Sequence, residues 1–214
     1  MNITKCCKYS WMSYYPVQKR IRNQIVSIEG KNNSRVLYCK EDNSTYVSFR
    51  GTYNKENLRS CMNAEPITTV YGKVHKGFFT IYMSLRNEIC SLLEKDDSQN
   101  ILFTGHSMGG AVAIISSIDN LESLKKRGKN IYCCTFGTPC TSDKDFMTYA
   151  RENLDNILNI ELPYDVVPYL TANPVFTNPS NLVILPGSEK KNSNMMDIFK
   201  NHSCKEYYRG VFML

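Results

Sequence analysis

A serine between two glycines, in Gly105-His106-Ser107-Met108-Gly109, is the part of this sequence with the clearest chemistry. An apolar run at 101–104 precedes it, and small and aliphatic residues at 110–115 follow it. A Gly-x-Ser-x-Gly turn from a strand into a helix, called a nucleophile elbow, holds its serine in a strained backbone conformation with the hydroxyl exposed. The pattern therefore predicts Ser107 as a nucleophile. The alternative is a glycine-rich helix start with an ordinary N-cap serine.

The base for such a serine can be assigned by position. A serine nucleophile needs a base, and the base needs an acid that orients it. After a turn of this kind the chain order is serine, then aspartate or glutamate, then histidine. Of the 3 histidines, His75 precedes the serine, and His106 lies inside the turn, where the backbone directs it away from Ser107. His202 is therefore the predicted base, and its alternative role is that of a surface loop histidine.

The acid must lie between the serine and the histidine, on a loop that follows a strand. Asp165 meets this requirement, because it follows the run 160–164. Asp143 and Asp145 are rivals after an earlier strand, although their place before a helix suits N-terminal capping. Asp197 is too near the histidine in the chain to orient it comfortably. We therefore predict Asp165 as the orienting acid.

An oxyanion hole needs two backbone N–H groups aimed at one point. One is expected from Met108, which follows the nucleophile at the start of a helix. The other is expected from Thr52, which ends Arg50-Gly51-Thr52 directly after a strand-like run. Taken alone, Gly51-Thr52 also fits an ordinary turn at a strand end.

Alternating strands and helices surround these positions. The predicted strands are 36–39, 45–50, 101–104, 131–136, 157–162 and 182–185, and the predicted helices are 78–93, 146–154 and one that runs from the elbow to 127. The nearly unbroken apolar run at 131–136 is typical of a parallel strand covered on both faces. Together with the elbow, this order predicts an α/β-hydrolase fold, with a mostly parallel central sheet, an antiparallel start and helices on both faces.

The composition fits one globular domain over residues 1–214. The chain is 42% hydrophobic, which suffices for a single sizeable core, and no run is long and apolar enough to cross a bilayer. The 9 cysteines have no metal-ligand spacing, so we expect reduced thiols, no metal and no cofactor. Without the apolar core of a secretory signal, an intracellular protein is expected. The net charge of +6 accompanies no nucleic-acid-binding motif, and solvated surface charge explains it better than attraction to anionic lipid.

Six groups of residues occur in a characteristic order along the chain. They are Val47-Ser48-Phe49-Arg50-Gly51-Thr52, Val74-His75-Lys76-Gly77-Phe78, Gly105 to Gly110, Thr135-Phe136-Gly137-Thr138-Pro139 with Phe146 and Tyr149, Asp165-Val166-Val167-Pro168, and His202 with Tyr207. In this order they resemble the class 3, fungal-type lipases, a family of α/β-hydrolases. The resemblance implies hydrolysis of acylglycerols or related lipid esters, with Ser107, Asp165 and His202 as the catalytic triad. It also implies Thr52 and Met108 as oxyanion donors and a structural role for His75.

The chain departs from this family at several places. After Pro139 the usual Arg-Val-Gly is replaced by Cys140-Thr141-Ser142, and Glu161 and Leu162 stand where basic and polar residues usually precede the acid. The chain is also shorter than the secreted members, without their signal or their disulfide framework. These departures leave the catalytic geometry largely intact, but they prevent transfer of substrate choice and compartment.

Two further segments have an interface-like composition. Residues 53–69, which hold Leu58, Met62 and Ile67 among polar residues, occupy the place of the family's mobile lid. A hinged amphipathic flap and a packed surface loop explain this composition equally well. At the N-terminus, Trp11, Tyr14 and Tyr15 precede basic residues, and we expect that segment to cover an edge of the sheet.

The sequence thus predicts a serine carboxyl-ester hydrolase that acts on a lipid ester, in solution or at a membrane or droplet surface. Within the same fold, phospholipase A1, lysophospholipase, acyltransferase and small-ester esterase activities remain alternatives. A non-catalytic lipase-like scaffold is the alternative from another class. The chain retains the three triad residues and both oxyanion donors, and a scaffold without activity would not need them.

Overall fold

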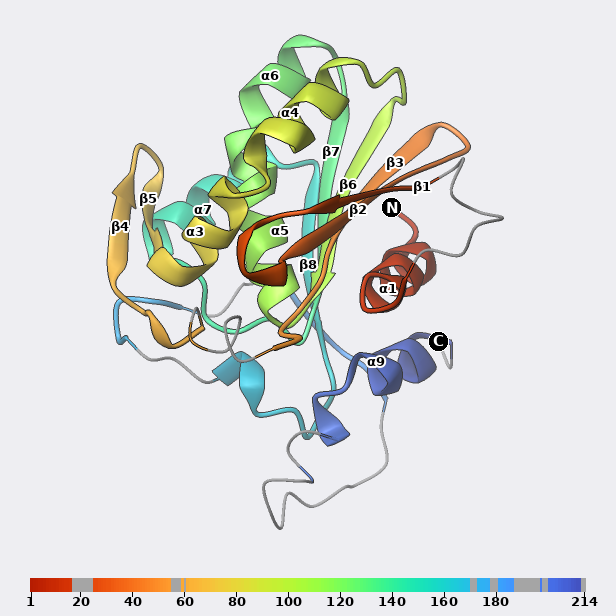
Figure 1. Cartoon of the computed structure of the whole chain (residues 1–214). Coiled ribbons are helices and arrows are strands. Elements are labelled where there is room, and N and C mark those ends of the chain that lie inside the picture. Colours follow the sequence, from red (N-terminus) through yellow and green to blue (C-terminus); the bar gives the residue numbers. More distant parts are fainter. Residues whose placement is uncertain are drawn as a thin grey trace.

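A central sheet organises the protein in the computed structural model, which describes residues 1–16, 25–54, 59, 61–169, 173–177, 181–186, 197 and 200–212. Within these residues the sheet has the strand order β1-β2-β3-β6-β7-β8-β9 (Figure 1). The strands are β1 (Ile25–Glu29), β2 (Arg35–Glu41), β3 (Ser44–Phe49), β6 (Asn100–His106), β7 (Asn130–Phe136), β8 (Asn156–Glu161) and β9 (Leu182–Ile184).

The sheet is antiparallel at its start and parallel thereafter. β1 pairs with β2 and β2 with β3 in antiparallel register, whereas β3, β6, β7, β8 and β9 are joined by parallel pairings. The strands β6 and β7 are almost wholly buried, because helices cover both of their faces. The predicted mostly parallel sheet with an antiparallel start is confirmed.

Each face of the sheet carries its own core. In β2, Val36 and Tyr38 belong to one cluster and Leu37 and Cys39 to the other, as the alternation of side chains along a strand requires. The first cluster includes residues of five helices: α3 (Lys76–Met83), α4 (Arg86–Glu94), α5 (Met108–Asp119), α6 (Leu121–Lys126) and α7 (Lys144–Asn153). The second is covered by α1 (Ile3–Met12) and α9 (Cys204–Val211), which pack side by side (Figure 1).

The expectation that the N-terminal aromatic segment covers a sheet edge is wrong. Helix α1 packs against β3, β6 and β7, in the middle of the sheet. Its buried face holds Cys6, Cys7 and Ser10, whose small side chains allow close approach to the strands. Trp11 stacks on Tyr208 of α9, with ring centroids 4.9 Å apart. The segment is therefore a structural layer over the central strands.

Two predicted helices are each divided in the structure. The predicted helix at 78–93 is α3 followed by α4, and the break lies at Ser84, whose hydroxyl donates to the Ile81 carbonyl at 2.8 Å. The helix after the elbow divides at Asn120, whose side chain donates to the Ser116 carbonyl at 2.9 Å. Such bonds from polar side chains to the backbone compete with the helical ladder, and hydrophobic periodicity does not reveal them.

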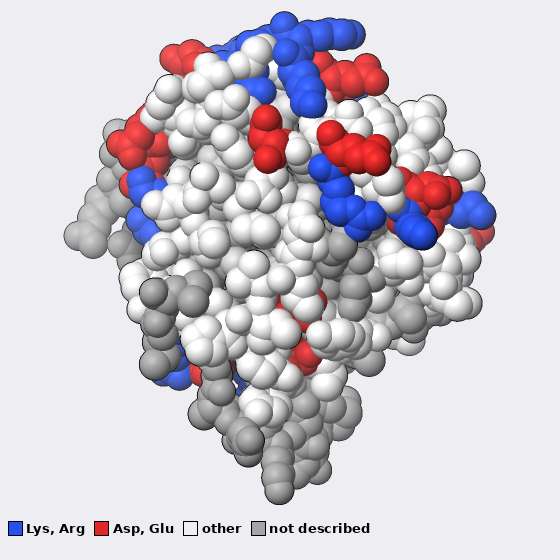
Figure 2. Space-filling model, turned by 180° about the vertical axis from the view of Figure 1, so that it is seen from behind, with Lys and Arg blue, Asp and Glu red and all other residues white. Residues whose placement is uncertain are grey.

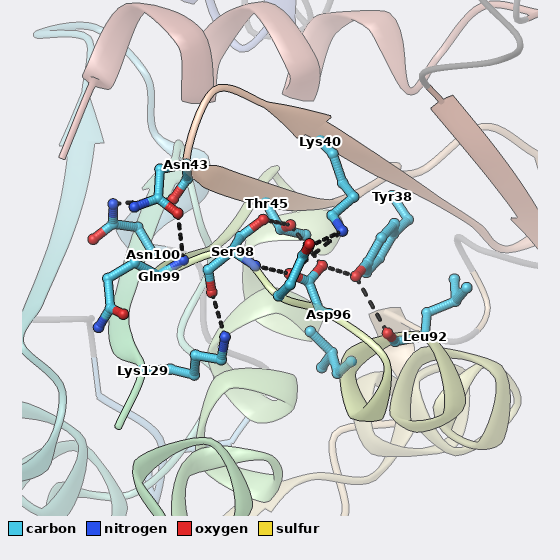
Figure 3. Close-up of polar contacts among 12 residues, drawn as sticks. Tyr38, Lys40, Asn43, Thr45, Leu92, Asp96, Ser98, Gln99, Asn100 and Lys129 are labelled. Carbon is cyan, nitrogen blue, oxygen red and sulfur yellow. Dashed lines mark hydrogen bonds and ion pairs between the residues drawn. The ribbon is translucent and has the colours of Figure 1, made fainter. Parts of the chain in front are cut away.

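A buried carboxylate in the loop before β6 contacts the middle of β2 and the start of β3 (Figure 3). Asp96 accepts hydrogen bonds from the Tyr38 hydroxyl, from Thr45 Oγ1 at 2.7 Å and from the Ser98 N–H at 2.7 Å. Burial of Asp96 opposes ionisation, but the hydrogen bonds outweigh it, so the pKa of Asp96 lies below its ordinary value. The network fixes the loop that leads into β6.

The segment 53–69 combines an anchored part with residues outside the described ranges. Pro66–Thr69 forms strand β4, which pairs with β5 (Gly72–His75), and Ile67 packs against the first core cluster. Met62 is 73% exposed, whereas Leu58 lies outside the described residues. Residue Ile67 therefore belongs to a hairpin and not to a flap. Among the described helices, none has the length and apolar character needed to cross a membrane.

Candidate active site

The elbow places Ser107 at the point where β6 turns into α5. The serine has φ 58° and ψ −131°, a backbone conformation that few non-glycine residues adopt. The glycines on either side are required by close packing: a Cβ on Gly105 would lie 2.4 Å from the Gly109 carbonyl oxygen, and one on Gly109 would lie 2.2 Å from the Phe49 carbonyl oxygen. The start of α5 therefore packs directly on the end of β3.

The structure brings Ser107, His202 and Asp165 into one hydrogen-bonded row. His202 Nε2 lies 2.7 Å from Ser107 Oγ, and His202 Nδ1 lies 2.7 Å from Asp165 Oδ2. The aspartate lies in the loop after β8, and the histidine lies just before α9. Because an ionised carboxylate only accepts hydrogen bonds, Nδ1 carries the proton and Nε2 is free to accept from the serine hydroxyl.

The buried Asp165 is held by two further donors. The Val167 N–H donates to Asp165 Oδ1 at 2.9 Å, and the Tyr207 hydroxyl donates to Asp165 Oδ2. Burial, followed by the nearby Asp165, raises the pKa of Tyr207 well above its ordinary value, which keeps the phenol protonated as a donor. Sequence reasoning assigned no role to Tyr207. The available signal was its spacing from His202, five positions along the chain on α9.

The rival acids take structural roles at the start of α7. Asp143 is the N-cap of this helix, and its carboxylate accepts from the Phe146 N–H at 3.0 Å. Asp145 is exposed in the first turn, where its negative charge complements the helix dipole. Neither carboxylate takes part in the row formed with His202, so the structure favours Asp165.

The two predicted oxyanion donors follow the neighbouring strands β3 and β6, on the side of the sheet where both strands finish. Thr52 comes shortly after β3, whose Phe49 is paired with Gly105 of β6, and Met108 is the first residue of α5. The first N–H groups of a helix have no acceptor within the helix, so the Met108 amide is available to a ligand. The loop is braced by buried Arg50, which donates to the Asn33 carbonyl, and Thr52 Oγ1 lies 3.4 Å from Cys61 Sγ.

The two other histidines have partners of their own. His75 caps α3 by accepting from the Gly77 N–H at 3.1 Å, and its Nε2 lies 3.1 Å from the Cys61 carbonyl oxygen. His106 lies between Tyr14, whose hydroxyl is 2.8 Å from Nδ1, and the His202 carbonyl oxygen, 2.7 Å from Nε2. Burial lowers the pKa of both His75 and His106. The predicted direction of His106, away from Ser107, agrees with these contacts.

One face of the molecule shows a group of basic side chains. Viewed from behind, Lys and Arg side chains gather over the end of the molecule where α6 lies, and the centre of that face carries few charges (Figure 2). The last turn of α6 contributes Lys125 and Lys126. The elbow lies toward the opposite end, where β6 finishes (Figure 1). Across the described ranges, no group of three or more His, Cys, Asp or Glu side chains could hold a metal ion.

The sheet, the elbow and the row of serine, histidine and aspartate define an α/β-hydrolase. A family model described as lipase (class 3) matches residues 46–174. The chain therefore belongs to the class 3 lipase family. The match includes Ser107 and Asp165, whereas α1 and His202 lie outside it.

Several curated proteins are similar in sequence. A lipase from Rhizomucor miehei is 28% identical over 155 residues, 64% of this chain and 40% of the lipase. Protein EDS1B of Arabidopsis thaliana is 26% identical over 168 residues, 64% of this chain and 26% of that protein. The chloroplastic phospholipase A(1) DAD1 of Arabidopsis thaliana is 28% identical over 144 residues, 56% of this chain and 32% of that protein. The chain thus spans less than half the length of each of these relatives.

A solved structure of the Rhizomucor miehei lipase propeptide complex matches with a TM-score of 0.69 at 21% identity. The match covers 86% of this chain and 67% of that chain. At this level of identity the likeness shows the α/β-hydrolase fold.

Proposed function

We propose that this protein is a serine carboxylic-ester hydrolase that acts on lipid esters and forms an acyl-enzyme. The observation that carries the proposal is the row of hydrogen bonds from Ser107 Oγ through His202 to Asp165, with both distances at 2.7 Å. Membership of the class 3 lipase family supports lipid esters as the substrate class. The nine cysteines are all reduced, and this supports an intracellular setting.

The geometry supports a two-stage reaction. Ser107 Oγ attacks the acyl carbonyl carbon while its proton moves to His202 Nε2, and the N–H groups of Thr52 and Met108 bind the oxyanion. The tetrahedral intermediate then collapses, and the leaving alcohol takes the proton from His202. Water attacks the acyl-enzyme with His202 again as base, which releases the fatty acid and restores Ser107. Asp165 holds the histidine tautomer and stabilises the imidazolium in both stages.

A labelling experiment with the purified protein tests this proposal. A fluorophosphonate probe should react with the wild-type protein at Ser107, as located by mass spectrometry of the labelled peptide. Ser107→Ala should abolish both labelling and ester turnover, since loss of the nucleophile costs on the order of 10⁶-fold in kcat. The circular dichroism spectrum and melting temperature should stay near wild type. Labelling at another residue, or near wild-type turnover by the variant, would remove Ser107 from the mechanism.

Phospholipase A1 activity is the second candidate. It is favoured by the similarity to the phospholipase A(1) DAD1, whose sequence aligns with 56% of this chain. A panel of a triacylglycerol, a diacyl phospholipid, a lysophospholipid and a short soluble ester separates these possibilities. Preferred release of the sn-1 acid from the phospholipid would select phospholipase A1. Complete inactivity on all four, without probe labelling, would favour the non-catalytic scaffold.

A further inference from the structure

The contacts of His106 join three segments that are distant in the sequence. Its Nε2 lies 2.7 Å from the His202 carbonyl oxygen, and its Nδ1 lies 2.8 Å from the Tyr14 hydroxyl. A carbonyl oxygen only accepts hydrogen bonds, so Nε2 carries the proton. A neutral imidazole has a single N–H, so Nδ1 must accept, and the Tyr14 hydroxyl must donate. The direction of both hydrogen bonds is therefore determined.

We propose that Tyr14 and His106 are positioning residues for the catalytic base: Tyr14 donates to His106 and orients its ring, and His106 in turn holds the backbone of His202. The inference rests on the proposed function for its kinetic consequence, although the tautomer itself does not depend on activity. Both residues act through His202.

The backbone carbonyl of His202 is well placed to be held in this way. It lies before the first turn of α9, in which the N–H groups of Glu206 and Tyr207 bond back to the Ser203 carbonyl. The His202 side chain is held by Ser107 and Asp165, so His106 adds a third tether on the main chain. These three tethers restrain both ends of the residue, and a misplacement of a catalytic group by about 1 Å can cost on the order of 10²-fold in rate.

The neutral state of His106 matters because its ring lies beside that of His202. The two ring centroids are 4.7 Å apart. Burial first, and then the proximity of His202, lower the pKa of His106 well below its ordinary value. During turnover His202 takes up the proton of Ser107, and a second positive charge at this distance would oppose that step. A neutral His106 that only donates to the carbonyl avoids this repulsion.

Helix α1 ends two residues before Tyr14, and its contacts hold Tyr14 in place. Ser10 Oγ lies 3.0 Å from Thr104 Oγ1 on β6, which joins the helix to the strand that carries the elbow. Trp11 stacks on Tyr208, which joins it to α9. The Tyr14 hydroxyl also packs against Gly51, where an added Cβ would lie only 1.9 Å from it. Helices α1 and α9 lie side by side on one face of the sheet (Figure 1). The N-terminal helix therefore supports the segment that carries His202.

Tyr14→Phe removes the donor with little change in packing. We expect kcat to fall about 10- to 100-fold with KM nearly unchanged, since substrate contacts are kept. The matched control is Tyr9→Phe, which removes a hydroxyl on α1 that is 2.9 Å from Glu41 Oε2 and remote from the site. The control should keep near wild-type kcat. Equal kcat values for Tyr14→Phe and wild type would overturn the proposal.

A double-mutant cycle separates action through His106 from action through the oxyanion loop at Gly51. If Tyr14 acts through His106, Tyr14→Phe should cost at most a few-fold in kcat in a His106→Asn background, because the two changes interrupt one chain of contacts. A full 10- to 100-fold loss in that background would show that Tyr14 acts elsewhere, and would overturn the proposal while leaving the hydrolase assignment intact.

Nitrogen-15 NMR of histidine-labelled protein provides a readout that requires neither turnover nor a His106 variant. In wild type, His106 should show the neutral tautomer with the proton on Nε2. In Tyr14→Phe, the Nδ1 resonance should shift because this nitrogen loses the hydrogen bond that it accepts, whereas Tyr9→Phe should match wild type. A wild-type His106 protonated on Nδ1, or an Nδ1 resonance unchanged in Tyr14→Phe, would overturn the proposal even if the protein hydrolyses no ester.

Discussion

At the scale of single residues, the carboxylate of Asp165 shows how this site keeps one geometry. One oxygen faces His202 Nδ1 and the Tyr207 hydroxyl, and the other accepts from the Val167 N–H. These donors leave the carboxylate a single orientation, in which its charge faces the imidazole. The chemistry of the site therefore depends on the ionised acceptor, and removing the charge should matter more than changing the size of the side chain.

Asp165→Asn should lower kcat on the order of 10⁴-fold, because an amide at this position favours the wrong tautomer of His202. The measurement is steady-state hydrolysis of a chromogenic ester, with far-ultraviolet circular dichroism to confirm folding. Asp143→Asn is the control, since that carboxylate only caps α7 and should affect stability by about 1 kcal/mol or less. A crippled Asp143→Asn beside an active Asp165→Asn would reverse the assignment of the acid.

At the scale of elements, the turn after β7 lies directly against the carboxylate of Asp165. Gly137 has φ +56°, and a Cβ there would lie 2.7 Å from Asp165 Oδ2 and 2.6 Å from the Tyr207 hydroxyl. The turn thus approaches the carboxylate closely only because it carries no side chain. Gly128, at the end of α6, has a similar φ of +68° but nothing within 4 Å of an added Cβ.

This pair of glycines separates backbone strain from crowding. Gly128→Ala should lose about 1 kcal/mol of stability, because alanine is strained at positive φ, and Gly137→Ala should lose at least as much. Only Gly137→Ala should also reduce kcat, by about 10-fold or more, since its methyl group displaces the acid. Thermal unfolding and ester hydrolysis of both variants are the measurements. Equal loss of activity in the two variants would show that the turn does not position Asp165.

At the scale of the whole molecule, the two ends of the parallel strands have different tasks. The ends where β3 and β6 finish carry the loop with Thr52 and the elbow, as expected for open parallel sheets. The opposite ends are joined by the buried Asp96 and its donors Tyr38, Thr45 and Ser98 (Figure 3). Stability and chemistry are therefore open to separate tests.

Asp96→Asn should lower the free energy of unfolding at pH 7 by about 3 kcal/mol, because hydrogen bonds to a buried charge are lost, while kcat stays unchanged at temperatures below unfolding. The folded-state pKa of Asp96 is depressed, so its stabilisation is present above the unfolded-state pKa of about 4 and is lost as the pH falls through the folded-state pKa. The difference between the two proteins should therefore shrink below about pH 4.

The control for Asp96→Asn is Asp97→Asn. The carboxylate of Asp97 is exposed and pairs with Lys40 at the surface, so its removal should have a much smaller effect. Urea denaturation at pH 7 and at a series of lower pH values measures both variants. A difference between wild type and Asp96→Asn that is constant across this series would show that the charge of Asp96 does not stabilise the fold.

The sequence by itself determined the features that obey local rules. The elbow was predictable because glycines, a preceding strand and a following helix must occur at set positions in one short stretch. The mostly parallel sheet followed from apolar runs that alternate with helical periodicity. The place of His202 beside Ser107 was predictable because chain order left a single histidine downstream of the serine. The N-cap at Asp143 was predictable because this aspartate stands just before a predicted helix.

Only the tertiary structure decided the contacts between distant segments. Tyr207 meets Asp165 although they are 42 positions apart, and Tyr14 meets His106 although they are 92 apart. The strand order and the packing of α1 beside α9 create these contacts, and spacing along the chain does not encode either. The place of α1 over the central strands was mispredicted for the same reason. Local periodicity shows which side of a helix is buried, but the surface that covers it depends on the assembly of the whole sheet.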